Sequence, residues 1–186
     1  MATKKVGVLV GSLRKESFNR KIAKELMAVA PADLALEEVA IGALPIFNQD
    51  FDDEGTTPAE WVTFRETLKR YDAFLFVTPE YNRSVPAVLK NAIDIGSRPY
   101  GKNLWDGKPG AVVSVSIGGI SGFGANHHLR QTLVFVNVAT MPQPEAYIGN
   151  AAALFDAKGA LVNEGTREFL KSFMAAFAAW VAKVSK

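Results

Sequence analysis

The chain has 186 residues, of which 48% are hydrophobic and 22% charged, and its formal net charge is +2. These values are typical of one globular domain with a substantial core, here expected to span residues 1–186, and they argue against a nucleic-acid-binding protein. Because the chain has no cysteine, disulfides, thiolate nucleophiles, Cys-ligated zinc and iron–sulfur clusters are excluded, and any electron transfer needs a bound organic cofactor.

The N-terminal part of the chain predicts a strand, a helix and a second strand. Residues 6–10 form a continuous apolar run, which is typical of a strand buried on both faces of a sheet. Apolar residues then recur at helical spacing over 22–30, and Pro31 ends that helix. Residues 34–39 alternate enough in polarity to predict a second strand, closer to an edge of the sheet.

An irregular segment, 42–58, follows the second predicted strand. Its acidic run over 50–54 is expected to be solvated surface. Thr57 and Pro58 predict the start of the next helix, with Thr57 as the capping residue and Pro58 in the first position. The apolar stripe of that helix extends over 61–71.

The central part of the chain repeats this alternation. Residues 73–77 predict a third buried strand, and Pro86 opens a helix that continues to residue 93. The polar, partly aromatic stretch 98–105 is neither clearly core nor clearly a tail. A fourth strand is predicted over 111–116 and a further helix reaches residue 136.

The C-terminal part predicts a fifth strand over 139–148 and a long helix over 170–184. Pro142 and Pro144 interrupt that strand and place it at an edge or a bulge. Five strands, each followed by a helix, predict an α/β fold with a doubly wound, five-stranded parallel sheet and helices on both faces.

Ligands of such sheets bind outside the carboxyl ends of the strands. The loop 11–19 leads from the first strand into a helix and carries Ser12, Ser17, Asn19 and Arg14, which can bind a phosphate at the helix N-terminus. The alternative is that Ser17 or Asn19 is an ordinary helix cap and Arg14 a surface residue. The patterns of dinucleotide-binding and Walker loops are absent here.

Two further loops follow strands in the same way. The loop 78–84 can present a backbone edge and the ring of Tyr81 to a planar ligand, although a simple tight turn would give the same pattern. The glycine-rich loop 116–124 allows close backbone approach to a flat ring, or is a flexible connector. The three loops together favour FMN over ATP or NAD. No metal site is expected, because the adjacent His127 and His128 diverge on a helix.

The segments GSLRKESFN (11–19) and TPEYNRSVPAVLKNAID (78–94) resemble the NADPH-dependent FMN reductase family, in particular its chromate and quinone reductase branch. The resemblance covers nearly the whole chain. It implies a flavodoxin-like fold, bound FMN, NADPH or NADH as electron donor, and a homodimer or homotetramer. The chain departs from the family at Ile95, where many relatives have Trp, and at His127, where some have Tyr near the subunit contact.

The resemblance also assigns roles to individual residues. The cofactor-binding set that it implies is Gly11, Ser12, Arg14, Ser17, Phe18 and Asn19 around the FMN phosphate and ribityl chain, Pro79, Glu80, Tyr81 and Asn82 along the isoalloxazine ring, and Ser116, Gly118 and Gly119 on its other side. Tyr81, Asn82 and Arg98 are candidates for contact with the second substrate. No catalytic side chain is expected, because the flavin carries the chemistry.

The sequence therefore predicts an FMN-dependent NAD(P)H oxidoreductase that passes hydride to quinones, chromate, azo or nitro compounds, or free flavin. The first alternative is a flavodoxin-type electron carrier, which the isoelectric point near 8.8 and Arg14 disfavour. A more distant alternative is a phosphate-ester hydrolase or a regulatory nucleotide-binding module. We expect a cytoplasmic protein, because the apolar run near the N-terminus is too short for a signal peptide and the last helix is too charged to span a bilayer.

Overall fold

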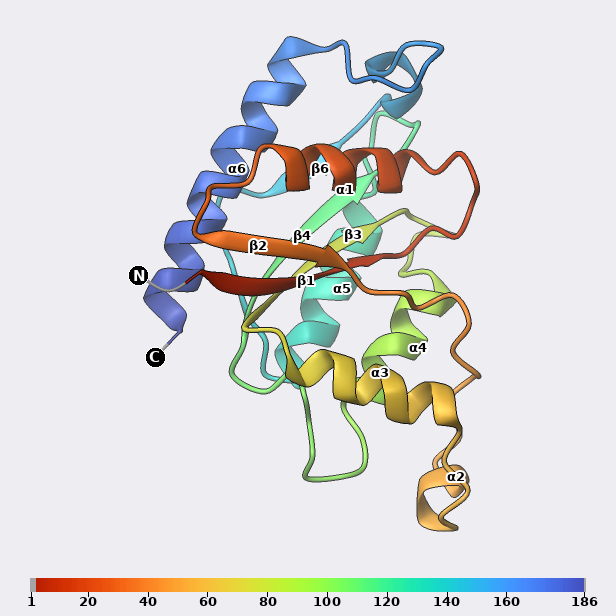
Figure 1. Ribbon diagram of the computed structural model, residues 1–186. Coiled ribbons are helices and arrows are strands. Elements are labelled where there is room, and N and C mark those ends of the chain that lie inside the picture. The colour runs from red at the N-terminus through yellow and green to blue at the C-terminus, as the bar shows by residue number, and fades with distance from the viewer. Residues whose placement is uncertain (1–2, 186) are drawn as a thin grey trace.

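The structure is a computed structural model that describes residues 3–185 as helices around one parallel sheet (Figure 1). The order across the sheet is β2-β1-β3-β4-β5, with β6 also paired to β4. The strands are β1 (Lys4–Val10), β2 (Leu34–Glu38), β3 (Ala73–Thr78), β4 (Pro109–Val115), β5 (Ala139–Thr140) and β6 (Ala146–Ile148). This order is the flavodoxin-like one, and every strand pair in it is parallel.

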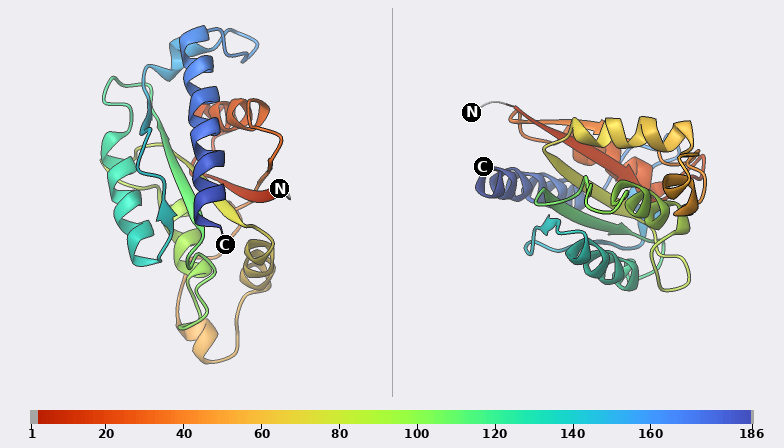
Figure 2. Two further views of the ribbon diagram at one scale, coloured as in Figure 1. Left: turned by 90° about the vertical axis from the view of Figure 1, so that its left-hand side faces the viewer. Right: turned by 90° about the horizontal axis from the view of Figure 1, so that it is seen from below.

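The two faces of the sheet are covered by different helices (Figures 1 and 2). The longer helices are α1 (Phe18–Ala28), α3 (Ala59–Lys69), α4 (Ala87–Gly96), α5 (Phe123–Phe135) and α6 (Glu164–Val184). Helices α1 and α6 contribute to one hydrophobic cluster, and α3, α4 and α5 to the other. The predicted fold class, a doubly wound parallel sheet with helices on both faces, is therefore confirmed.

Strand β1 shows why its sequence is apolar at successive positions. Val8 and Val10 pack into the cluster under α1 and α6, whereas Leu9 packs into the cluster under α3 and α4. All three are at most 2% exposed. Because side chains of a strand alternate between faces, a strand buried on both sides needs apolar residues at every position.

The fifth predicted strand is divided in two. Strand β5 pairs with Pro109 and Gly110 of β4, and β6 pairs with the stretch from Val113 to Val115 further along the same strand. Pro142 and Pro144 lie between the two pieces. Because proline has no N–H to donate to a ladder, the prolines interrupt this edge as predicted, and six strands occupy the five positions.

The acidic run differs from the prediction of solvated surface. It forms the short helix α2 (Asp50–Asp53), and the Asp52 carboxylate is buried. Both its oxygens accept hydrogen bonds from the Arg65 guanidinium, at 2.7 and 2.6 Å. These hydrogen bonds hold the pKa of Asp52 below its ordinary value, against the opposing effect of burial. The prediction is wrong for Asp52 because its partner is thirteen residues away on another helix.

One smaller prediction also needs correction, and one unassigned stretch finds its place. Thr57 does not cap α3, because its hydroxyl donates to Asp52 at 2.9 Å and Pro58 occupies the capping position. The stretch 98–105 ends in the core, since Trp105 is fully buried and its indole N–H donates to Ile93 O at 2.9 Å. Within residues 3–185, no helix is long and apolar enough to cross a membrane.

Candidate functional site

The loops after β1, β3 and β4 enclose a cleft of about 200 Å³ at the carboxyl edge of the sheet. We call it the three-loop cleft. Its lining residues are Ser12, Arg14, Ser17, Phe18, Asn19, Pro79, Glu80, Tyr81, Val115, Ser116 and Ile117. All except Val115 and Ile117 belong to the cofactor-binding set predicted from the sequence. The structure thus brings together residues that are more than 100 positions apart in the chain.

The first loop places an open helix N-terminus at the cleft. Ser17 caps α1, since its hydroxyl oxygen accepts the Arg20 N–H at 3.2 Å, and its own hydroxyl proton can still be donated. The backbone N–H groups of Phe18 and Asn19 have no acceptor within residues 3–185. A helix N-terminus with free N–H groups favours an anion. The cap and the anion site, posed as alternatives from the sequence, are compatible here.

Gly11 lets this loop approach the loop after β3. Its N–H donates to Val77 O at 2.9 Å, which continues the pairing of β1 with β3 beyond the strand. A Cβ at this position would lie 3.1 Å from Pro79 Cδ and 3.3 Å from the Leu89 side chain. A residue with a side chain would therefore push the first and second loops apart.

Asn19 carries the clearest sign of a missing partner. The residue is 5% exposed, and its Oδ1 atom is buried without a hydrogen-bond partner in the described part of the chain. Buried polar atoms nearly always have partners, and leaving one unpaired costs about 1–3 kcal/mol. A ligand hydroxyl can donate to this oxygen, or a rotated carboxamide can donate to a phosphate. The residues present therefore fit a phosphorylated sugar-alcohol chain.

The second loop combines a tight turn with an exposed ring. The backbone groups of Tyr81 and Ser84 exchange two hydrogen bonds, at 3.1 and 3.0 Å. Asn82 and Arg83 between them have left-handed backbone conformations, with φ of 50° and 66°. Tyr81 is 46% exposed and lines both the three-loop cleft and a neighbouring cavity of about 470 Å³. Asn82 lines neither of these two cavities.

The third loop contributes Ser116 and Ile117 to the lining. The Ser116 hydroxyl oxygen accepts the Gly118 N–H at 3.1 Å, which fixes the start of the glycine-rich stretch. Gly118 and Gly119 follow the lining residues but do not themselves line the cleft. Val115 and Ile117 were not predicted, and their only sequence signal is that they flank Ser116 at the end of β4.

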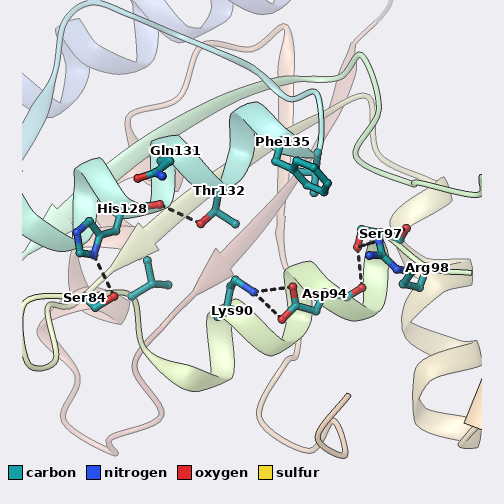
Figure 3. Close-up of a pocket in the computed structure, with 11 residues that line it drawn as sticks. Ser84, Lys90, Asp94, Ser97, Arg98, His128, Gln131, Thr132 and Phe135 are labelled. Carbon is teal, nitrogen blue, oxygen red and sulfur yellow. Dashed lines mark hydrogen bonds and ion pairs between the residues drawn. The ribbon is translucent and has the colours of Figure 1, made fainter. Parts of the chain in front are cut away.

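Arg98 is not among the residues that line the three-loop cleft, and it lies in a separate groove (Figure 3). It lines a groove of about 540 Å³ between α4 and α5, together with Lys90 and His128. Its guanidinium donates to the Ser97 hydroxyl at 3.1 Å. Within one chain, the structure does not bring Arg98 to the three-loop cleft, so its proposed contact with the second substrate stays a prediction.

The two histidines contact different partners. His127 Nε2 lies 2.9 Å from the Tyr147 hydroxyl, and His128 Nδ1 lies 3.1 Å from the Ser84 hydroxyl. Among residues 3–185, no group of three or more His, Asp or Glu side chains is arranged to hold a metal ion.

Comparison with known proteins agrees with this geometry. The family model described as NADPH-dependent FMN reductase matches residues 4–153. A quinone reductase of Pseudomonas putida is 60% identical over 176 residues, covering 95% of this chain and 94% of its own. A 2-hydroxy-1,4-benzoquinone reductase of Burkholderia sp. is 45% identical over 177 residues, covering 95% of this chain and 96% of its own.

A solved structure gives the same result. FerB, a flavoenzyme NAD(P)H:(acceptor) oxidoreductase from Paracoccus denitrificans, superimposes with a TM-score of 0.91 at 41% identity. The match covers 99% of this chain and 100% of that one. The resemblance read from 11–19 and 78–94 is confirmed: the chain belongs to the NADPH-dependent FMN reductase family.

Proposed function

We propose that the protein is an FMN-dependent NAD(P)H:quinone oxidoreductase. The observation that carries the proposal is the three-loop cleft, in which a helix N-terminus and the Asn19 Oδ1 atom, both without acceptors or donors within residues 3–185, lie beside an exposed aromatic loop. Relatives named as quinone reductases and as an NAD(P)H flavoenzyme support it. Bound FMN would supply the redox chemistry, accepting hydride from NADPH or NADH and delivering it to the acceptor.

The residues of this chain would bind and orient the cofactor. The N–H groups of Phe18 and Asn19, the hydroxyls of Ser12 and Ser17, and the Arg14 guanidinium would hold the phosphate. The second and third loops would enclose the isoalloxazine ring, through Pro79, Glu80, Tyr81, Asn82, Ser116, Gly118 and Gly119. The neighbouring apolar cavity, which shares Arg14 and Tyr81 with the cleft, gives a planar acceptor access from that side.

The proposal extends to further electron acceptors and to the assembly of the protein. Chromate, azo or nitro compounds and free flavin are further acceptors, and the chain acts as one domain over 1–186 that assembles into a homodimer or homotetramer. The absence of a strong charge bias supports small-molecule acceptors and no nucleic acid. The cytoplasmic location stays a prediction from the sequence.

The first experiment is a binding titration of the purified protein with FMN and with riboflavin, followed by fluorescence. Riboflavin lacks the phosphate and is the matched control. We expect at least a tenfold preference for FMN, because the phosphate would make several charge-assisted hydrogen bonds. Equal affinity for the two flavins would show that the first loop does not bind the phosphate.

The second experiment measures turnover. The FMN-loaded protein is mixed with NADPH or NADH and benzoquinone, and oxidation of the donor is followed by absorbance. An enzyme oxidises the donor continuously, whereas a flavodoxin-type carrier shows little turnover without a separate reductase. Loss of the flavin spectrum on purification together with no FMN binding would contradict the proposal and favour a different phosphate ligand.

A further inference from the structure

Helix α5 begins without a cap of its own. The capping position is Gly122, which has no side chain to accept a hydrogen bond, and the first turn of α5 has no acidic residue. Helices α1 and α6 differ, since Ser17 and Asn163 accept N–H bonds from their first turns. The first N–H groups of a helix need acceptors from outside it.

The acceptor for α5 comes from the second loop. Glu80 Oε2 accepts the Ala125 N–H at 3.1 Å, across a sequence separation of 45 residues. The other oxygen, Oε1, accepts a hydrogen bond from Arg83 at 2.6 Å, and the carboxylate side chain is only 10% exposed. A carboxylate at a helix N-terminus also interacts favourably with the helix dipole. Glu80 therefore caps α5 from the loop after β3.

Gly124 makes room for this contact. A Cβ at residue 124 would lie 2.9 Å from Arg83 O and 3.0 Å from Glu80 Oε2. Both distances are shorter than side-chain carbons normally tolerate, and one of them is to backbone. The second loop and the first turn of α5 are thus in direct contact, and only glycine permits that approach.

A second contact fixes the far end of the same loop. The Ser84 hydroxyl lies 3.1 Å from His128 Nδ1, one turn further along α5 (Figure 3). Ser84 also closes the turn that displays Tyr81. The loop is therefore attached to one helix at two points, Ala125 and His128.

We propose that Glu80 is a positioning residue that sets the spacing between two walls of the three-loop cleft. Its carboxylate joins the second loop, which carries Pro79 and Tyr81, to the helix that follows the third loop. This inference rests on the proposed flavin site and refines it: Glu80 acts through α5, whereas the family resemblance placed it along the isoalloxazine ring. Because this spacing is already set in the FMN-free protein, little free energy is lost in ordering the loops when FMN binds.

The test uses Glu80→Ala, Glu80→Gln and Gly124→Ala in the full-length protein, with FMN affinity measured by fluorescence. Glu80→Ala removes the cap, and we expect FMN to bind about 3- to 30-fold more weakly, the range that corresponds to loss of a helix cap. Glu80→Gln keeps an oxygen acceptor, so we expect this variant to bind FMN with an affinity within about threefold of that of the wild type. Glu66→Ala, which removes an exposed glutamate that pairs with Lys69, is the control.

Gly124→Ala perturbs the contact without removing any residue that lines the cleft. We expect a loss of FMN affinity similar to that of Glu80→Ala, and no additive loss when the two are combined. Alanine is the better helix former, so a purely local effect would have the opposite sign. Gly165→Ala is the matched control, because Gly165 has the same position in α6 and ordinary space for a Cβ.

Amide hydrogen exchange of the FMN-free protein gives a second measurement. We expect the Ala125 amide to exchange several-fold faster in Glu80→Ala and to recover in Glu80→Gln. The proposal is overturned if Gly124→Ala binds FMN like wild type, or if Glu80→Gln is as weak as Glu80→Ala. A wild-type protein that binds no FMN overturns the proposed function instead, whatever the exchange of Ala125 shows.

Discussion

Two irregular segments leave neighbouring strands at the same edge of the sheet and use their polar groups in opposite ways. Residues 42–58, after β2, are bound to the helices by side chains of the core. Asn91 accepts the Phe47 N–H at 2.8 Å and donates to Pro45 O at 3.0 Å, and the Trp61 indole donates to the same carbonyl. The buried pair of Asp52 and Arg65 completes this attachment.

Residues 11–17, after β1, make few such contacts. Gly11 N–H, the Glu16 carboxylate and the Ser17 hydroxyl have protein partners, whereas Arg14 makes no ion pair or side-chain hydrogen bond within residues 3–185. The backbone amides of Phe18 and Asn19, which follow this loop, also have no acceptor in the described part of the chain. A loop is thus structural when the protein satisfies its polar groups, and is built for a ligand when these groups remain open beside a cleft.

The largest expected effect is on the structural segment. Asp52→Ala leaves the Arg65 guanidinium buried without its carboxylate, and removal of one partner of a buried ion pair costs about 3–5 kcal/mol. We expect this loss in the free energy of unfolding, measured with urea, and little change in the FMN affinity of the folded protein. Asp53→Ala is the control, because Asp53 is exposed and its carboxylate bonds, within residues 3–185, to Gln49 alone. Equal losses in the two variants would show that the segment is not held by this pair.

The next effect is on the ligand-binding loop. Arg14→Ala removes a charge-assisted contact to the proposed phosphate, and we expect FMN to bind roughly ten- to a hundredfold more weakly. The stability of the FMN-free protein should not change, because Arg14 has no side-chain partner to lose among the described residues. Lys15→Ala, an exposed cation beside it that does not line the cleft, is the control. Unchanged flavin retention in Arg14→Ala would place the phosphate elsewhere.

Two buried asparagines give a matched pair for the same comparison. Asn19 is 5% exposed, and its oxygen has no partner in the part of the chain that the structure describes, whereas Asn91 is 7% exposed with its oxygen and its amide both bonded. We expect Asn91→Ala to cost about 1–3 kcal/mol of stability and to leave FMN affinity intact. Asn19→Ala should leave the stability of the FMN-free protein intact and weaken FMN binding by roughly fivefold or more. Urea unfolding measures the stability of both variants, and titration measures their FMN affinity. If both variants lost stability and FMN affinity alike, the distinction between the two segments would be wrong.

The sequence predicts those features of the fold and of the cleft that depend on local residue patterns. Apolar runs locate the strands, and the residue types after β1 and β3 indicate a phosphate and a planar ring. The sequence also predicts which residues line the cleft, because the carboxyl ends of parallel strands meet at one edge of the sheet. Even the divided edge strand is visible in Pro142 and Pro144.

What the sequence does not predict depends on distant partners. Nothing local distinguishes Asp52 from Asp50 or Asp53, since the burial of Asp52 requires Arg65 on another helix. In the same way, nothing local shows that the carboxylate of Glu80 is directed to the amide of Ala125. Side-chain direction in a loop is decided by tertiary contacts, which residue type and spacing do not record.

The smallest expected effect is a difference in pH response between the two segments. The hydrogen bonds from Arg65 lower the pKa of Asp52 from its ordinary value of 3.8, so the pair stabilises the fold fully above that pH. As the pH falls through the lowered pKa, the folded protein must take up the proton and the contribution is lost. The difference in unfolding free energy between wild type and Asp52→Asn should therefore be constant near pH 6 and shrink below 3.8.

The ligand-binding loop should respond at higher pH, because a phosphate loses its second charge below a pKa of about 6. The ratio of FMN affinities between wild type and Arg14→Ala is then expected to fall between about pH 7 and pH 5, where the Asp52 contribution is still complete. Urea unfolding and FMN titration over this range measure the two responses separately. If both changed over the same pH range, Asp52 and Arg14 would belong to one coupled network, and the division between a structural and a ligand-binding segment would be wrong.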